Sequence, residues 1–466
     1  MLDPIIGFDA IDLAAAFRSR ALDPVECLDL CFARIGESDR TLNCFTALSE
    51  RARLDAEASA ARFRAGAPRG LLDGVPIAIK DNLVVEGMPA TWGSRLFAGA
   101  AAPADEAPIA RIRAQGAVIV GKTNTPEFSI EGYTANALFG VTGNAWQPDL
   151  TPGGSSGGSA SAVAAGLVPI AIGTDGGGSI RRPAAYTGLF GLKPSVGRIP
   201  RAGGLPQLLR DFEVVGTLTR SVRDARALLG AMSPRGSPAH QGGDGLTSST
   251  RTRQDLRILF VEAIDGSPCD PAILASVRLA AGRLAAMGHS VEVGSLPFEI
   301  AEFNALWPSI GASGLARLMA DRPDFRTKVP ETYVAIAEAG MRVSDADLAH
   351  IDELVRSLRT LAGEAFANID LIVTPCCAAM PWAANVPFPD TIDGTPVGPR
   401  AHAIYTGWVN AIGHPAVSIP CDPAADGLPI GVQVVGPSGG DDLLLDIAAR
   451  YEASHPWRYP WQADRT

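Results

Sequence analysis

The sequence predicts an α/β protein built on a mostly parallel central sheet, and two observations lead to that fold class. Short apolar segments, about four to eight residues long and typical of buried strands, alternate with longer segments whose apolar residues show helical spacing. Residues 256–261, 271–287 and 290–293 form one strand, helix and strand unit of this kind, which favours parallel strands. In addition, 47% of the residues are hydrophobic and 19% are charged, which supports a large core and argues against disorder.

The individual elements follow from local patterns along the chain. Amphipathic spacing predicts helices at residues 23–35, 48–64, 108–115, 221–229, 271–287 and 441–451. Apolar runs predict strands at residues 74–80, 117–120, 256–261, 290–293, 370–374, 416–419 and 431–435. Pro24 suits the first turn of its helix, where a missing N–H costs no hydrogen bond. Residues 233–255 are rich in Gly, Ser, Pro and charge, so we expect an exposed loop that is open to proteolysis.

Residues 151–195 hold two serine-bearing glycine loops separated by an apolar segment. Flexible linkers are also glycine-rich, but residues 160–173 between the loops are almost wholly apolar and suit a packed helix followed by a buried strand. The second loop places three glycines before Ser179, so backbone N–H groups can converge there on a tetrahedral oxyanion. A Walker-type phosphate loop is the alternative, but neither loop has Lys followed by Ser or Thr after its glycines.

A serine nucleophile needs a neighbouring base, and Lys80 is the best candidate upstream. It ends an apolar strand-like run, where loss of solvation would lower its pKa and leave some neutral amine. The alternative is an ordinary solvated or ion-paired lysine. Lys122 and Lys193 are further candidates for the base, although both lie beside loop residues that suit structural hydrogen bonding. The histidines show no pattern of a Ser-His-Asp triad.

Taken together, these motifs resemble those of the amidase signature family of serine hydrolases. The likeness is strongest in residues 153–195 with Lys80 upstream, and it extends to VIVGKTN at 118–124, NAIGHPAVSIP at 410–420 and GLPIGVQVVGP at 427–437. It covers most of the chain, from about residue 23 to residue 457. The resemblance implies a mixed, mostly parallel sheet with helices on both sides. It also implies one domain over residues 1–466, with the signature core at 74–230 and a variable substrate-side region at 296–400.

The same resemblance implies a Ser-Ser-Lys triad and an oxyanion hole. Ser179 matches the nucleophile, Ser155 the bridging serine, which follows a cis peptide bond, and Lys80 the base. The oxyanion hole would be made by the backbone N–H groups of four consecutive residues, Gly176, Gly177, Gly178 and Ser179. The family often has Thr or Ile at the position of Gly176 and Cys at that of Thr187, and neither difference removes a catalytic group.

Arg182 is a candidate substrate-binding residue. The pair Ile180-Arg181 after Ser179 is similar to that of the family, whereas a second arginine is less usual. In malonamidase-like relatives an arginine near the nucleophile receives a substrate carboxylate, which suits a planar guanidinium. An ion pair with one of the many acidic residues is the alternative.

The sequence of the substrate-side region allows two interpretations of its aromatic residues. Residues 296–338 form either surface helices whose aromatic side chains belong to the core or an apolar wall of a substrate pocket, and these aromatic residues are Phe298, Phe303, Trp307, Phe325 and Tyr333. The Gly- and Pro-rich residues 387–400 can form a further pocket lip.

The net charge, the hydropathy and the cysteine pattern argue against several classes of partner and site. A formal net charge of −10 argues against a nucleic-acid partner. No apolar run approaches a membrane span and the first residues lack a basic leader, so we expect a cytoplasmic protein without membrane contact. Seven scattered cysteines form neither a disulfide framework nor a zinc pattern, and Cys376 and Cys377 suit buried structural positions better than a thiol nucleophile. We expect no metal or other cofactor.

The leading hypothesis is therefore an amidase for small or aryl amides, with anilides and carbamates (urethanes) as plausible substrates because the same acyl-enzyme chemistry serves them. One alternative is the glutaminase subunit of a tRNA-dependent amidotransferase, which needs a partner chain. Another is a non-catalytic binding protein on the same fold, although the presence of Lys80, Ser155 and Ser179 argues against it. The resemblance favours a homodimer.

Overall fold

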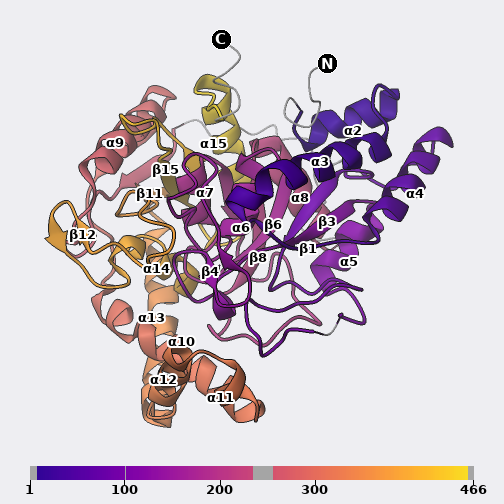
Figure 1. Ribbon diagram of the computed structural model, residues 1–466. Coiled ribbons are helices and arrows are strands. Elements are labelled where there is room, and N and C mark those ends of the chain that lie inside the picture. The colour runs from indigo at the N-terminus through magenta and orange to yellow at the C-terminus, as the bar shows by residue number, and fades with distance from the viewer. Residues whose placement is uncertain (1–7, 100, 235–254, 460–466) are drawn as a thin grey trace.

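An eleven-stranded sheet forms the centre of the molecule (Figure 1). The structure is a computed structural model that describes residues 8–99, 101–234 and 255–459. The strands are, in their spatial order, β1 (Phe45–Leu48), β3 (Val118–Thr123), β2 (Pro76–Lys80), β6 (Ile170–Asp175), β8 (Val214–Thr219), β7 (Phe190–Lys193), β14 (Ala416–Pro420), β15 (Gly431–Val435), β11 (Leu371–Pro375), β9 (Arg257–Phe260) and β10 (Ser290–Val293).

The sheet is mixed, and six of its eleven strands belong to two parallel groups. One group is β3-β2-β6 and the other is β11-β9-β10. The strands between the groups pair antiparallel with their neighbours, and β1 joins β3 antiparallel at one edge. Because β2 and β6 run side by side in the same direction, their carboxyl ends lie at the same edge of the sheet.

Helices cover both faces of this sheet, as the sequence led us to expect. They are α2 (Ala10–Ser19), α3 (Pro24–Leu42), α4 (Ala52–Arg64), α5 (Ala107–Ala114), α6 (Gly157–Ala164), α7 (Arg181–Thr187), α8 (Val222–Met232), α9 (Pro271–Ala286), α10 (Ala301–Asp321), α11 (Phe325–Lys328), α12 (Glu331–Gly340), α13 (Asp345–Ala365), α14 (Gly407–Ile412) and α15 (Asp441–Ser454). On β2, Ile77 and Ile79 join one buried cluster with Leu228 of α8, while Ala78 joins another with Val163 of α6. Successive strand residues point to opposite faces, so both faces are buried under helices.

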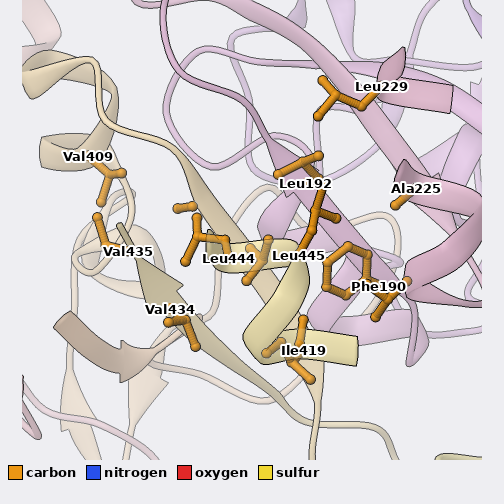
Figure 2. Packing of buried hydrophobic residues seen from close by; sticks show 14 of the residues in the cluster. Phe190, Leu192, Ala225, Leu229, Val409, Ile419, Val434, Val435, Leu444 and Leu445 are labelled. Carbon is orange, nitrogen blue, oxygen red and sulfur yellow. The ribbon is translucent and has the colours of Figure 1, made fainter. Parts of the chain in front are cut away.

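One part of the core joins segments from the middle of the chain to segments near its C-terminal end. Figure 2 shows side chains of β7, β14 and β15 gathered with Ala225 and Leu229 of α8 and with Leu444 and Leu445 of α15. These residues are all buried. The C-terminal helix therefore completes a core that contains strands from distant parts of the sequence.

Most expected elements are present, and the largest differences at their ends are in two helices. The helix expected at residues 48–64 begins only at Ala52, because Leu48 ends the edge strand β1. Helix α3 continues to Leu42, well past the expected end at residue 35, and Pro24 occupies its first turn as predicted. The loop expected at residues 233–255 falls almost wholly on residues 235–254, which lie outside the described residues.

Residues 296–400 contain a group of helices whose bounds the sequence pattern did not give. Helices α10, α11 and α12 lie together at the bottom of Figure 1, at the end of the molecule opposite α2 and α15. Helices α10 and α12 cross so closely that a Cβ on Gly340 would lie 2.0 Å from the carbonyl oxygen of Ala312. Among the described residues, none of the helices has the length and apolar character needed to cross a bilayer.

Candidate active site

Lys80 and the second glycine loop meet at one edge of the sheet. Lys80 is the last residue of β2, and the neighbouring parallel strand β6 ends at Asp175, directly before the three glycines that precede Ser179. The strand order thus brings together side chains that are almost a hundred positions apart in the chain. This is the usual place for a site in an open α/β sheet.

Lys80 is fully buried and held by hydroxyl groups. Its Nζ donates to Oγ of Ser155 at 2.6 Å and to Oγ1 of Thr174 at 2.9 Å. Burial lowers the pKa of Lys80 from its ordinary value to about 7, while the negative charges of Glu213 and Asp175 act in the opposite direction. A substantial fraction of the amine is therefore neutral near neutral pH, as a general base requires.

Ser155 lies in the first glycine loop, just before helix α6. The peptide bond between Gly154 and Ser155 is cis, as the family resemblance led us to expect. A Cβ on Gly154 would lie 2.4 Å from the carbonyl oxygen of Tyr133, so a larger residue does not fit there. The next residue, Ser156, ties the two loops together, because its N–H donates to the carbonyl of Ser179 at 3.1 Å.

Ser179 follows the three glycines and lines a cavity of about 620 Å³. Its hydroxyl makes no hydrogen bond with any residue of the described ranges, including Ser155. The loop corrects one sequence expectation, because the N–H of Gly178 already donates to Oδ1 of Asp175 at 2.7 Å. No such bond engages the N–H groups of Gly176, Gly177 or Ser179 in the part of the chain that the structure describes, so these three remain candidates for an oxyanion hole.

A buried ion pair fixes the loop around Ser179. Arg181 is completely buried and donates to Asp175 through Nε at 3.0 Å and Nη2 at 2.8 Å. It also donates to Gln433 Oε1 at 2.6 Å and to the carbonyl of Thr406 at 3.1 Å. Burial is the largest single influence and by itself would raise the pKa of Asp175. The charge and hydrogen bonds of Arg181, together with the charge of Lys193 and a hydrogen bond from Asn410, outweigh burial and hold that pKa well below its usual range. The carboxylate therefore stays charged and continues to accept the hydrogen bonds that hold the loop in place.

Replacing Arg181 with methionine is expected to lower the free energy of unfolding by about 3–5 kcal/mol, because Asp175 would remain charged and buried without its partner. Guanidinium denaturation measures the loss. Arg356→Met is the matched control, because Arg356 pairs with Glu353 on the exposed surface of α13 and should change stability little. Equal effects of the two substitutions would contradict a special role for the Arg181 ion pair.

The two alternative lysines are buried but do not contact either serine. Nζ of Lys122 donates to the carbonyls of Asp81 and Pro89, each at 3.0 Å. Nζ of Lys193 donates to the carbonyl of Pro194 at 3.0 Å, although burial, with the charge of Arg181, lowers its pKa to about 7 as well. A perturbed pKa is thus not unique to Lys80 in this protein. What distinguishes Lys80 is its direct contact with Ser155.

Arg182 lines the same cavity as Ser179, next to groups that sequence reasoning missed. Its Nη1 lies 2.9 Å from Nε2 of His402, and no carboxylate among the described residues lies within ion-pair distance of it. Burial and the charges of Arg182 and Arg400 hold the pKa of His402 well below its ordinary value, so the ring is neutral and Nε2 accepts a hydrogen bond. The ion pair with an acidic residue, considered as the alternative for Arg182, is therefore absent from the described structure.

The aromatic residues of the substrate-side region divide between core and cavity. Trp307 lines the cavity and abuts the glycine loop, since a Cβ on Gly177 would lie 2.7 Å from its ring. Phe298 and Phe303 are core residues instead. Phe325 and Tyr333 pack against Phe128 and are not among the residues that line the cavity. Of the expected lip at residues 387–400, positions 398–400 line the cavity.

The sequence profile of the amidase family matches residues 26–445, which is most of the chain. The chain belongs to the amidase signature family. AmiB2 of Mycobacterium tuberculosis, a protein named as an amidase, is 36% identical over 97% of this chain and 98% of its own length. A glutamyl-tRNA(Gln) amidotransferase subunit from a Picosynechococcus species is 33% identical over 93% of this chain and 95% of its own.

Solved structures of the family agree with this membership. The crystal structure of a bacterial aryl acylamidase of the amidase signature family superposes with a TM-score of 0.85 at 28% identity, covering 97% of this chain and 96% of that one. Our chain is accordingly an amidase, an enzyme that hydrolyses amide C–N bonds. Within the described ranges, no group of three or more His, Cys, Asp or Glu side chains is arranged to hold a metal ion.

Proposed function

We propose that this amidase hydrolyses small or aryl carboxylic amides through a serine acyl-enzyme, with Ser179 as nucleophile, Ser155 as bridging serine and Lys80 as base. The observation that carries the proposal is the 2.6 Å hydrogen bond from Nζ of Lys80 to Oγ of Ser155. It joins a buried amine of lowered pKa to a hydroxyl in the loop that packs on Ser179. This bond supplies one link of a proton relay, and the relay is completed when Oγ of Ser179 turns toward Oγ of Ser155, with which it makes no hydrogen bond in this structure.

In the acylation step, Oγ of Ser179 attacks the amide carbon and a C–O bond forms. The Ser179 proton passes to Ser155, whose own proton passes to the neutral amine of Lys80. The π electrons of the carbonyl move onto its oxygen, which the N–H groups of Gly176, Gly177 and Ser179 stabilise. Collapse of this intermediate breaks the C–N bond, and the relay returns a proton to the departing nitrogen. An ester on Ser179 and a free amine result.

Deacylation runs the same relay with water in place of Ser179. The relay takes a proton from a water molecule as its oxygen attacks the ester carbon. The new tetrahedral intermediate collapses with cleavage of the bond to Oγ of Ser179. The proton returns to Oγ, and the carboxylic acid leaves. Lys80 thus acts first as base and then as acid in each half-reaction.

The cavity supports small and aryl substrates. A volume of about 620 Å³ falls in the usual range for small-molecule sites, and the ring of Trp307 offers a flat apolar surface. The likeness to an aryl acylamidase favours anilides. Carbamates belong to the same proposal, because attack on their carbonyl carbon uses the same groups. Arg182 remains a proposed substrate contact, with Nη1 engaged by His402 and Nε by the carbonyl of Gly178.

The nucleophile is tested by covalent labelling. A fluorophosphonate probe is expected to add one label per chain, which fragmentation of the labelled peptide should place on Ser179. Ser155→Ala should slow labelling strongly, because the relay is broken while the nucleophile remains. Labelling of a different serine, or unimpaired labelling of the Ser179→Ala variant, would show that the nucleophile has been assigned wrongly.

A glutaminase role within an amidotransferase is the second candidate, favoured by the likeness to the Picosynechococcus protein over nearly the whole chain. Affinity purification of the chain from its own cells distinguishes the two functions. A stoichiometric partner that is required for glutamine hydrolysis would support the amidotransferase. Hydrolysis of anilides by the isolated chain supports the amidase and also excludes a non-catalytic binding protein. The homodimer expected from the resemblance is tested by light scattering on the same sample.

A further inference from the structure

Arg400 places an unpaired cation on the wall of the cavity that holds Ser179. It lies at the end of the expected lip, directly before a short 3₁₀ helix at Ala401–Ala403, and is half-buried. Its Cζ sits 4.3 Å from the centroid of the Trp307 ring, a distance typical of a cation–π contact. Its side chain makes no hydrogen bond or ion pair with any residue in the described part of the chain. The guanidinium donors are therefore available to a ligand.

The charges around the cavity do not cancel. Two guanidinium groups, Arg182 and Arg400, line it together with one carboxyl group, Glu131, and the ring of His402 is neutral. Glu131 forms no ion pair with either arginine among the described residues, and burial raises its pKa against the influence of both cations. Burial, with the charge of Arg182, lowers the pKa of Arg400 to about 9, which still leaves it charged at neutral pH. The cavity is therefore positive and lacks one counter-charge.

Trp307 connects this cation to the reaction centre. Its ring abuts Gly177 of the loop that carries Ser179, and it supports Arg400 by the cation–π contact. A substrate that lies along the ring can therefore reach both Ser179 and the guanidinium. A planar guanidinium held against a ring presents its donors as a fork, which matches a carboxylate.

We propose that Arg400 binds a carboxylate carried by the substrate, so that this amidase prefers amides that bear a free carboxylate over uncharged amides of the same size. The inference rests on the proposed function, because it takes Ser179 as the point of attack. It adds a specificity residue that lies 221 positions from the nucleophile in the sequence and lines the same cavity. Trp307 contributes the apolar surface for the chain or ring between the amide and the carboxylate.

Two substrate pairs test the preference. Glutaric monoanilide and pentananilide differ by a carboxylate on the acyl part, while 4-acetamidobenzoate and 4-methylacetanilide differ by a carboxylate on the leaving group. The wild-type enzyme should show a higher kcat/KM for the acid in at least one pair, and the responding pair shows which part of the substrate faces Arg400. A preference for the uncharged member in both pairs would overturn the proposal.

Substitutions at Arg400 separate recognition from structure. Arg400→Gln should lower kcat/KM for the preferred acid by about 10- to 150-fold, the usual value of a charge-assisted hydrogen bond. It should change the uncharged partner less than about threefold, and Arg400→Lys should recover part of the loss. Arg356→Gln, on the exposed face of α13, is the control and should affect neither substrate. An equal loss for both members of the pair would mean that Arg400 only supports Trp307.

A binding measurement tests the carboxylate site independently of catalysis by Ser179. Calorimetric titration of glutaric monoanilide and 4-acetamidobenzoate into Ser179→Ala protein measures the binding affinity for each acid in the absence of turnover. Binding of either acid that weakens about 10- to 150-fold when Arg400→Gln is added supports the carboxylate site, even where no hydrolysis is found. Binding that is unchanged by Arg400→Gln refutes the site, whatever the outcome for catalysis.

Discussion

Replacing Ser179 with alanine is expected to lower kcat/KM for a good anilide substrate by about 10⁴- to 10⁶-fold, because the atom that forms the acyl bond is lost. Its hydroxyl makes no hydrogen bond with any residue in the described ranges, so its removal leaves no buried group unpaired. The variant should therefore keep the thermal unfolding midpoint of the wild type. Initial rates of aniline release and a thermal melt together measure the two expectations.

The relay predicts how further substitutions combine with Ser179→Ala. Groups that act as one unit are not additive, so Lys80→Met added to Ser179→Ala should cost little more activity than Ser179→Ala alone. Ser155→Ala alone should also impair turnover strongly, while Lys80 keeps its contact with Thr174 Oγ1 at 2.9 Å. Retention of more than about a hundredth of the wild-type rate by Ser179→Ala would contradict a serine acyl-enzyme.

Features encoded in contiguous sequence were predictable. The helix after the first glycine loop starts at Gly157, as the run of small residues indicated, and the apolar run that follows forms β6 up to Asp175. Lys80 ends a buried strand for the same reason, because its neighbours in the strand are apolar. Each of these predictions depends on a local pattern, so no knowledge of distant contacts was needed.

Features set by distant contacts were not predictable. Strand β1 has only four residues, and Leu48 is exposed within it, so the pattern resembles the start of the next helix. Nothing near Gly178 shows that its N–H will donate to Asp175, because the buried Arg181 network fixes the orientation of that carboxylate. Trp307 and Arg400 meet only because the helices of the substrate-side region fold back over the glycine loop, and no spacing between them encodes this contact.

The pH dependence of kcat/KM should follow the protonation of Lys80. Only the neutral amine can accept a proton, and burial lowers the pKa of Lys80 to about 7, so activity should rise with pH through this region and level off above it. Below it, kcat/KM should fall by about tenfold for each pH unit. A profile that stays flat down to about pH 5 would rule out a lysine base. Lys80→Met should lower kcat/KM by about 10³-fold or more and remove the dependence.

Substitution of Glu213 distinguishes Lys80 from Lys193 as the group whose protonation controls activity. Its negative charge is the strongest influence that raises the pKa of Lys80 against burial, so Glu213→Gln should move the rise in activity to lower pH. Glu353→Gln removes the same charge from the exposed surface and should leave the midpoint in place. Lys193 also has a pKa near 7, but Glu213 is not among the charges that act on it. If Lys193→Met shifts or removes the pH midpoint of activity while Glu213→Gln leaves it unchanged, the base is Lys193 and not Lys80.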